Sequence, residues 1–293
     1  MKFPFSISAF VLLAIFSASA QVVTVEVKLD QEEFLPGESL PVTVRIVNNS
    51  GQTLHLGADE NWLKFDVQSV DNSFPVQRNS NPPVIDAFDL QSSEAATKRV
   101  DIAPYFSLKR TDRYRVTATI HIPEWGTDVS SMPIEFDVIE GAEIWSHDFG
   151  VPLPAGASNR PPEIRKYILQ QANYLREQLR MYVLVTDQSR SQIFKVKAVG
   201  PMVSFSQPEA QLDNHSNLHV LYQSGATMFI YSVVNPDGDI AQQDIYDLLD
   251  SRPRLGLDSN GDIIVIGGVR RSKPGELPAV KMPDELPTPA KQK

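Results

Sequence analysis

The sequence predicts a mainly β protein, and three features carry that prediction. Apolar and polar residues alternate over 23–27 and 40–46, which is the period of a half-buried strand. An ungapped repeat at an offset of 45 residues relates 208–221 to 253–266, and each copy reads as a strand, a turn and a second strand. Only the region near 163–179 shows apolar residues at helical spacing. We therefore expect strands nearly throughout, with one helix.

Residues 1–20 read as a secretory signal peptide. A short positive start, an apolar run and the small residues Ser17 to Ala20 precede Gln21, which places cleavage between Ala20 and Gln21. The apolar run is shorter than the roughly 20 residues that cross a bilayer. We expect a bacterial chain that is secreted or periplasmic and has no membrane span after cleavage.

Residues 21–140 are expected to form a β-sandwich. The most informative segment is 111–120, where Tyr114 starts a late strand and Val116, Ala118 and Ile120 alternate inward. The segment resembles the tyrosine corner of immunoglobulin-like domains, in which the tyrosine hydroxyl bonds back to the chain.

The same half resembles the immunoglobulin-like modules of exported bacterial proteins, through Phe34 to Glu38 and a following strand that ends in Asn48-Asn49. The resemblance implies an immunoglobulin-like fold whose members usually lack active sites and act as spacers, adhesion modules or inhibitors. The chain has no cysteine, so no inter-sheet disulfide is possible. We expect apolar packing that includes Trp62 to take its place.

A helix is expected near 163–179 because Ile164, Tyr167, Ile168 and Ala172 recur near helical spacing after Pro162. Such a helix either covers the β domain around it or binds a partner, and the first role is the more common one.

Residues 141–271 are expected to form a β-rich repeat domain. Pro208 to Asp213 match Pro253 to Asp258 in character, and the match continues into the following strand. The pattern resembles β-propeller repeats, but a closed propeller has at least four blades. The sequence therefore predicts an incomplete propeller or a small stack of antiparallel sheets. Residues 272–293 are rich in proline and lysine and predict a disordered tail.

The sequence contains no recognisable catalytic, metal or cofactor motif. It lacks cysteine, G-x-S-x-G, S-x-x-K and the glycine-rich phosphate loops. His215 and His219 have the spacing of zinc ligands on a helix, but they lie on an expected strand, which separates them by roughly 13 Å. Asp258 to Asp262 reads as a turn and not as a calcium loop, because glycine and glutamate are absent from the required positions. We predict no catalytic residue, no metal site and no cofactor.

A cluster of arginines near the end of the repeat domain is a candidate binding patch. Arg252, Arg254, Arg270 and Arg271 lie close together in an acidic chain of net charge −9. The patch could receive a carboxylate, a sulfated sugar or an acidic protein, or its charges could serve only to discourage strand-edge aggregation. The overall charge argues against nucleic acid as a partner.

The sequence favours an exported, non-catalytic binding or scaffolding protein whose partner is an unknown protein or glycan. One alternative is a hydrolase of an extracellular polymer that uses Asp213, Asp237 and Asp258 on the repeat loops. A second alternative, from the immunoglobulin-like resemblance, is a protease-inhibitor-like module.

Overall fold

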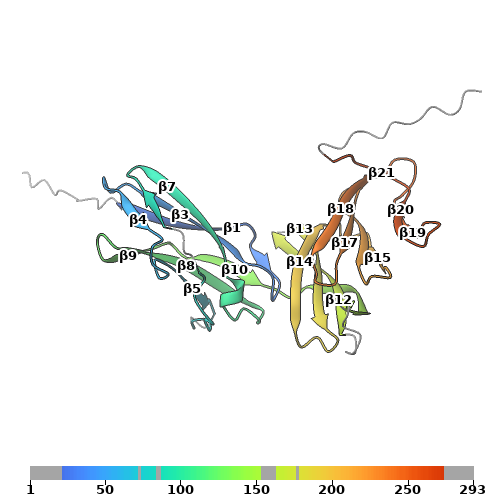
Figure 1. The fold of residues 1–293 in the computed structure, drawn as a ribbon, viewed down its shortest axis with the longest axis horizontal. Helices are drawn as coiled ribbons and strands as arrows, with labels where there is room; N and C mark the ends of the chain where they lie inside the picture. The colour runs from blue at the N-terminus through green and yellow to red at the C-terminus, as the bar shows by residue number, and fades with distance from the viewer. Residues whose placement is uncertain (1–21, 72–73, 84–86, 153–162, 176–177, 274–293) are drawn as a thin grey trace, which may run out of the picture.

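The computed structural model describes residues 22–71, 74–83, 87–152, 163–175 and 178–273, and within them the chain is mainly β (Figure 1). These residues form 21 strands, and a single 3₁₀ turn, Ala103–Tyr105, accompanies them. Every sheet draws its strands either from residues before 139 or from residues after 141.

The first half forms two main sheets and a small third one. One sheet has the order β1 (Val23–Leu29), β3 (Pro41–Asn48) and β7 (Glu94–Asp101). The other has the order β2 (Glu33–Phe34), β10 (Ile134–Val138), β8 (Asp112–Ile122) and β5 (Leu63–Ser69), with β9 (Thr127–Ser130) also paired to β8. The third pairs β4 (Leu54–Leu56) with β6 (Phe88–Leu90). β2 runs parallel to β10, and all other pairs of this half are antiparallel.

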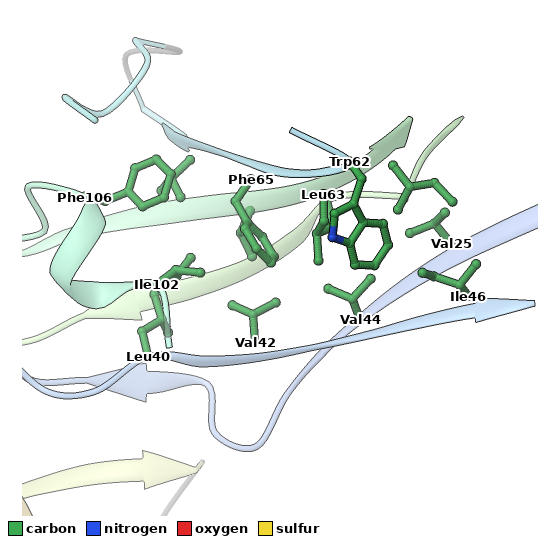
Figure 2. Close-up of a cluster of buried hydrophobic side chains, with 14 of the residues drawn as sticks. Val25, Leu40, Val42, Val44, Ile46, Trp62, Leu63, Phe65, Ile102 and Phe106 are labelled. Atoms are coloured by element: carbon green, nitrogen blue, oxygen red, sulfur yellow. The ribbon is translucent and has the colours of Figure 1, made fainter. Parts of the chain in front are cut away.

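The core of this half lies between its two main sheets (Figure 2). β3 alternates fully between buried and half-buried positions because Val42, Val44 and Ile46 face the second sheet. Trp62 is 1% exposed and packs in this core, as the sequence predicted for a sandwich without a disulfide. Tyr114 donates its hydroxyl to the carbonyl oxygen of Arg110 over 3.0 Å, which confirms the predicted bond back to the chain.

The second half consists of three successive antiparallel sheets. The first has the order β11 (Ala142–Gly150), β12 (Ile164–Leu175), β13 (Gln178–Asp187) and β14 (Ile193–Pro201). The second has the order β15 (Glu209–Leu212), β16 (Leu218–Gln223), β17 (Met228–Val234), β18 (Ile240–Asp247) and β21 (Val269–Arg270). The third is the hairpin of β19 (Arg254–Leu257) and β20 (Ile263–Ile266).

These sheets are stacked as layers with apolar residues between them. Tyr167 and Val183 of the first sheet share a buried cluster with Val220 and Tyr222 of the second. The opposite face of the second sheet packs against the hairpin through Leu255. The opposite face of the first sheet packs against the first half of the chain, where Leu35 shares a buried cluster with Ile168 and Tyr182.

The expected helix near 163–179 is wrong, because its described residues lie in β12 and at the start of β13. β12 is buried on both faces: Tyr167 and Leu169 point to the second sheet, whereas Ile168 and Ala172 point the other way. A strand buried on both faces loses its alternation and carries an apolar run, which periodicity alone does not separate from a helix.

The 45-residue repeat relates β15 to β19 and β16 to β20, whose first residues are each 45 apart. Each pair of strands is joined by a turn that begins with aspartate. Oδ1 of Asp213 and Oδ1 of Asp258 each accept the backbone N–H groups two and four residues ahead. Oδ1 of Asn235 makes the same two bonds between β17 and β18. The same kind of hairpin turn therefore recurs about halfway through each 45-residue repeat.

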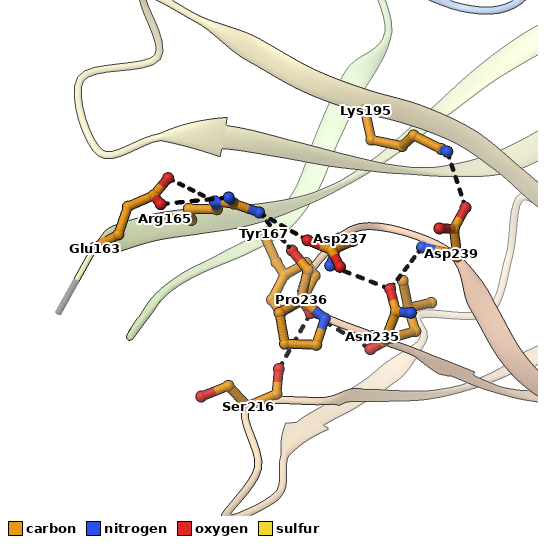
Figure 3. A network of polar contacts seen from close by, with 10 residues as sticks. Glu163, Arg165, Tyr167, Lys195, Ser216, Asn235, Pro236, Asp237 and Asp239 are labelled. Carbon is orange, nitrogen blue, oxygen red and sulfur yellow. Dashed lines mark hydrogen bonds and ion pairs between the residues drawn. The ribbon is translucent and has the colours of Figure 1, made fainter. Parts of the chain in front are cut away.

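Side chains tie these turns to the first sheet (Figure 3). Arg165 binds Glu163 at 2.8 Å and Asp237 at 3.2 Å, and it also donates to the carbonyl oxygen of Pro236. Tyr167 donates its hydroxyl to the carbonyl oxygen of Ser216 over 3.1 Å. This end of the stack is thus fixed by polar contacts in addition to its apolar core.

Candidate binding groove

A groove of about 540 Å³ lies where the first strands of the three stacked sheets meet. β11, β15 and the β19–β20 hairpin each contribute to its walls. Its lining includes Trp145, His147, Gln211, Asn214, Leu257 and Ile263. The groove therefore combines aromatic, amide and aliphatic side chains from segments that are far apart in the sequence.

The aromatic wall consists of Trp145 and His147, which lie two residues apart and point to the same side of β11. Their rings are stacked, with centroids 5.9 Å apart and planes inclined by 18°. Trp145 is half-buried against the core between the first two sheets, and His147 is exposed. The core thus holds the indole in place while both residues line the groove.

The polar wall offers neutral hydrogen-bonding groups. Within the described residues, the side-chain amides of Gln211 and Asn214 make no hydrogen bond to protein. Each amide has both donors and an acceptor, so the two side chains can bind hydroxyl or carbonyl groups of a ligand.

Asp213 also lines the groove, but its carboxylate is already used by the protein. Oδ1 accepts hydrogen bonds from the backbone N–H groups of His215 and Asn217. Oδ2 accepts hydrogen bonds from Nδ2 of Asn217 and Nε2 of His219. Burial acts to raise the pKa of Asp213, but the hydrogen bonds from Asn217 and its neighbours hold this pKa below the usual value. A carboxylate with four donors has no lone pair left for a substrate.

The other two candidate aspartates of the hydrolase alternative also lie in turns. Asp258 accepts backbone N–H groups of its own hairpin, and Asp237 pairs with Arg165 at 3.2 Å. Neither residue lines the groove. Each of the three aspartates therefore has a structural role in a different turn.

The four candidate arginines are exposed, and two of them are neutralised. Arg270 pairs with Asp244 at 3.3 Å, and Arg271 pairs with Asp247 at 2.6 Å. Arg252 donates to Oγ of Ser206 and lies over the ring of Phe229. The guanidinium of Arg254 makes no hydrogen bond or ion pair in the described part of the chain, whereas its backbone pairs with Ile266. The cluster is therefore not a surface of four free positive charges.

His219 is buried in β16 and bonds Tyr231 at 2.7 Å and Asp213 at 3.3 Å, while His215 lies in the exposed turn. Within the described residues, no group of three or more histidine, aspartate or glutamate side chains is placed to hold a metal ion. The predicted cleavage site at Ala20 and Gln21 lies outside the described residues.

No binding role was predicted from the sequence for Trp145, His147, Gln211 or Asn214. The one signal available was an aromatic residue and a histidine at alternate positions of an edge strand, which is too common to indicate a site. The groove depends on the packing of three sheets, and that packing brings together residues more than 60 positions apart.

No protein-family model matches the chain, and no curated protein does. Among solved structures, the chain is similar to the crystal structure of Spo0M, a sporulation control protein from Bacillus subtilis, at 11% identity and a TM-score of 0.31. That similarity covers 61% of this chain and 90% of the other. A TM-score of this size does not establish a shared fold, so it supports no argument about function. In the described residues, no helix has the length and apolar character needed to cross a bilayer.

Proposed function

We propose that the chain is an exported, non-catalytic binding protein and that its groove receives a neutral glycan. One observation carries the proposal: a stacked Trp145–His147 pair shares a groove with the unpaired amides of Gln211 and Asn214. A sugar ring has apolar C–H faces that pack on an aromatic ring and hydroxyl groups that bind amides at its edge.

The charges around the groove support a neutral ligand. Asp213 is the only ionised carboxylate among the lining residues, and its oxygens are occupied by four donors. A hydrolase that acts through paired carboxylates needs a free acid and a free base within one cleft. The bonding of Asp213 supports binding in preference to hydrolysis.

We also propose a detailed architecture for each half of the chain and a cellular location for the protein. The first half is an immunoglobulin-like sandwich, and the second half is a propeller-like stack that stops within its third layer. The groove then corresponds to the central channel of a propeller, where the innermost strands meet. Export as a secreted or periplasmic protein would bring this groove into contact with envelope or extracellular glycans.

The test is calorimetric titration of the full mature chain with neutral oligosaccharides of glucose and of N-acetylglucosamine. We expect Trp145→Ala to weaken binding about 10-fold or more, which corresponds to ~1.4 kcal/mol. Gln211→Ala and Asn214→Ala should each weaken it less, because one neutral hydrogen bond contributes about 1 kcal/mol. Gln91→Ala, an exposed amide on the other half, is the matched control. Equal affinity of the wild type and Trp145→Ala would refute the assignment.

A further inference from the structure

The outer edge of β20 is an unpaired strand edge. β20 pairs with β19 alone, and no other strand of the described chain is hydrogen-bonded to it. Hydrogen bonds alternate along an antiparallel ladder, and Asp258 N donates to Asp262 O at the closed end of this hairpin. It follows that the N–H and C=O groups of Ile263 and Val265 point away from β19.

The opposite edge of the hairpin is protected, and its bonding confirms which backbone groups of the hairpin point outward. The backbone N–H of Leu255 points away from β20 and donates to Oε2 of Glu209 over 2.8 Å. Leu255 lies opposite Val265 in the ladder. The hairpin therefore has one capped edge and one open edge.

The internal repeat shows what an equivalent edge accommodates. β16 lies 45 residues before β20, and its Leu218 and Val220 correspond to Ile263 and Val265. Those two residues of β16 pair with Val234 and Ser232 of β17. An antiparallel strand thus occupies the edge of β16 that is open in β20.

The chain does not supply such a strand after β20 within the described residues. Gly267 and Gly268, at φ of 79° and 65°, turn it back to β21, which pairs with β18. A Cβ atom at Gly267 would lie 2.8 Å from the carbonyl oxygen of Arg252, and one at Gly268 would lie 2.5 Å from Cγ of Pro253. Only glycine fits this turn, so the third layer ends at two strands.

β20 also lacks the protection that the other strand edges carry. Every other edge strand in the described residues contains at least one ionisable side chain, as is usual for edges that must not pair. Examples are Lys28 of β1, Lys64 of β5, Lys98 of β7, Asp148 of β11, Lys195 of β14 and Arg270 of β21. β20 has the sequence Ile-Ile-Val-Ile, and Ile264 and Ile266 are 39% and 54% exposed.

We propose that β20 is a docking edge for an extended segment of a partner protein, which adds to the hairpin as an antiparallel third strand. The segment that fits resembles β17, with apolar residues at alternate positions. Arg254 lies on the same outward face as Ile264 and Ile266 and has no counter-ion in the described part of the chain, so an acidic residue on that face of the segment complements it. The docking proposal does not rest on the proposed glycan, although the side chain of Ile263 lines the groove and its backbone belongs to the docking edge.

The experiment uses the full mature chain and a synthetic peptide with the sequence of Met228–Val234, flanked by glutamates for solubility and labelled for fluorescence anisotropy. We expect the wild type to bind this probe and Val265→Pro to lose at least 10-fold in affinity. Proline at 265 removes an N–H that no strand of the described chain uses, so the hairpin keeps its own bonds. Val265→Thr keeps the N–H and should bind within about twofold of the wild type.

Two further measurements make the result independent of how Val265→Pro folds. The same peptide, N-methylated on the amides that face β20, should lose binding to the wild type, because only backbone pairing is removed. Hydrogen exchange at Ile263 and Val265 should slow when the unmodified probe is added. No binding by the wild type, or equal binding of the N-methylated probe, would overturn the proposal. So would a dimer of the wild type that Val265→Pro abolishes, since a second copy would then occupy the edge.

Discussion

Arg180 of β13 donates a hydrogen bond from Nη1 to Oε1 of Gln31 over 2.8 Å, and this contact joins the two halves of the chain. Gln31 in turn donates to Oε1 of Glu38, whose other oxygen accepts the backbone N–H of Leu35. Leu35 is buried against Ile168 of the first stacked sheet and its neighbours. A buried polar chain and an apolar contact therefore connect the two halves.

Arg180→Met should destabilise the protein by about 1–3 kcal/mol, because it leaves the oxygen of a buried amide without its donor. Gln31 and Glu38 are each 8% exposed, so water does not readily replace the guanidinium. Urea unfolding measures the loss. Arg113→Met is the matched control, since Arg113 pairs with Asp137 at the surface and its loss should cost less. Equal losses of stability in the two variants would show that the contact between Arg180 and Gln31 adds nothing beyond a surface ion pair.

Gly261→Ala tests the backbone of the repeated turn. Gly261 has φ of 84°, and a Cβ there would meet no atom within 4 Å, so the expected loss of about 1–2 kcal/mol comes from conformation alone. Gly238 has φ of 83° in the equivalent turn, but its Cβ would lie 2.8 Å from the side chain of Lys195. Gly238→Ala should therefore cost more.

Gly150→Ala is the control for both turn variants, because Gly150 has open space and no positive φ. Thermal unfolding of the three variants should rank Gly150→Ala as the most stable and Gly238→Ala as the least. If Gly261→Ala matched Gly150→Ala, the turn would tolerate a side chain at its left-handed position.

The sequence predicted strands best where one face of the sheet is buried and the other is partly exposed. β3 and β8 alternate along their whole length, and their inward residues, such as Val44 and Val116, were identified correctly. The prediction failed at β12, where a helix was expected, because Ile168 and Leu169 point to two different cores and the alternation is lost. The turns at Asp213 and Asp258 were found because Asp and Gly or Asn mark such turns locally.

The groove was not predictable for a different physical reason. Trp145 and Gln211 become neighbours only through the stacking of separate sheets, and neither carries a local signal. The arginine cluster was predictable as a group of neighbouring charges, but the partners of those charges were not. Arg270 and Arg271 are close in sequence, but pairing of β21 with β18 places each beside an aspartate, and the sequence gives no sign of that pairing.

Tyr167→Phe and Tyr222→Phe form a matched pair within one buried cluster. Tyr167 donates to the carbonyl oxygen of Ser216, whereas the hydroxyl of Tyr222 has no partner among the described residues. Tyr167→Phe should lose about 1–2 kcal/mol in urea unfolding, because the partly buried carbonyl oxygen of Ser216 loses its hydroxyl donor. Tyr222→Phe should be neutral or more stable by up to ~1 kcal/mol, since it removes an unsatisfied polar atom. The reverse ranking would show that the hydroxyl of Tyr167 does not stabilise the cluster through its hydrogen bond.

Asp187 should make the turn between β13 and β14 sensitive to acid. Hydrogen bonds from Oγ of Ser189 and from the backbone N–H of Gln192 lower the pKa of Asp187 to about 2, below the usual value of 3.8 for an aspartate. A depressed pKa means that the folded state favours the carboxylate. The stabilisation is therefore present above pH 4 and is lost as the pH falls towards 2.

NMR titration of the Asp187 carboxyl carbon measures this directly and should give a midpoint well below 3.8. The difference in unfolding free energy between the wild type and Asp187→Asn should be present at pH 6 and should shrink as the pH falls from 4 to 2, because protonation removes the charge that the variant lacks. Asn235 begins the turn between β17 and β18 with a neutral amide oxygen, so asparagine at 187 can still accept a backbone N–H of its turn while it lacks the acid dependence. A midpoint near 4 for Asp187, or a difference that does not change with pH, would show that the hydrogen bonds do not favour the ionised form.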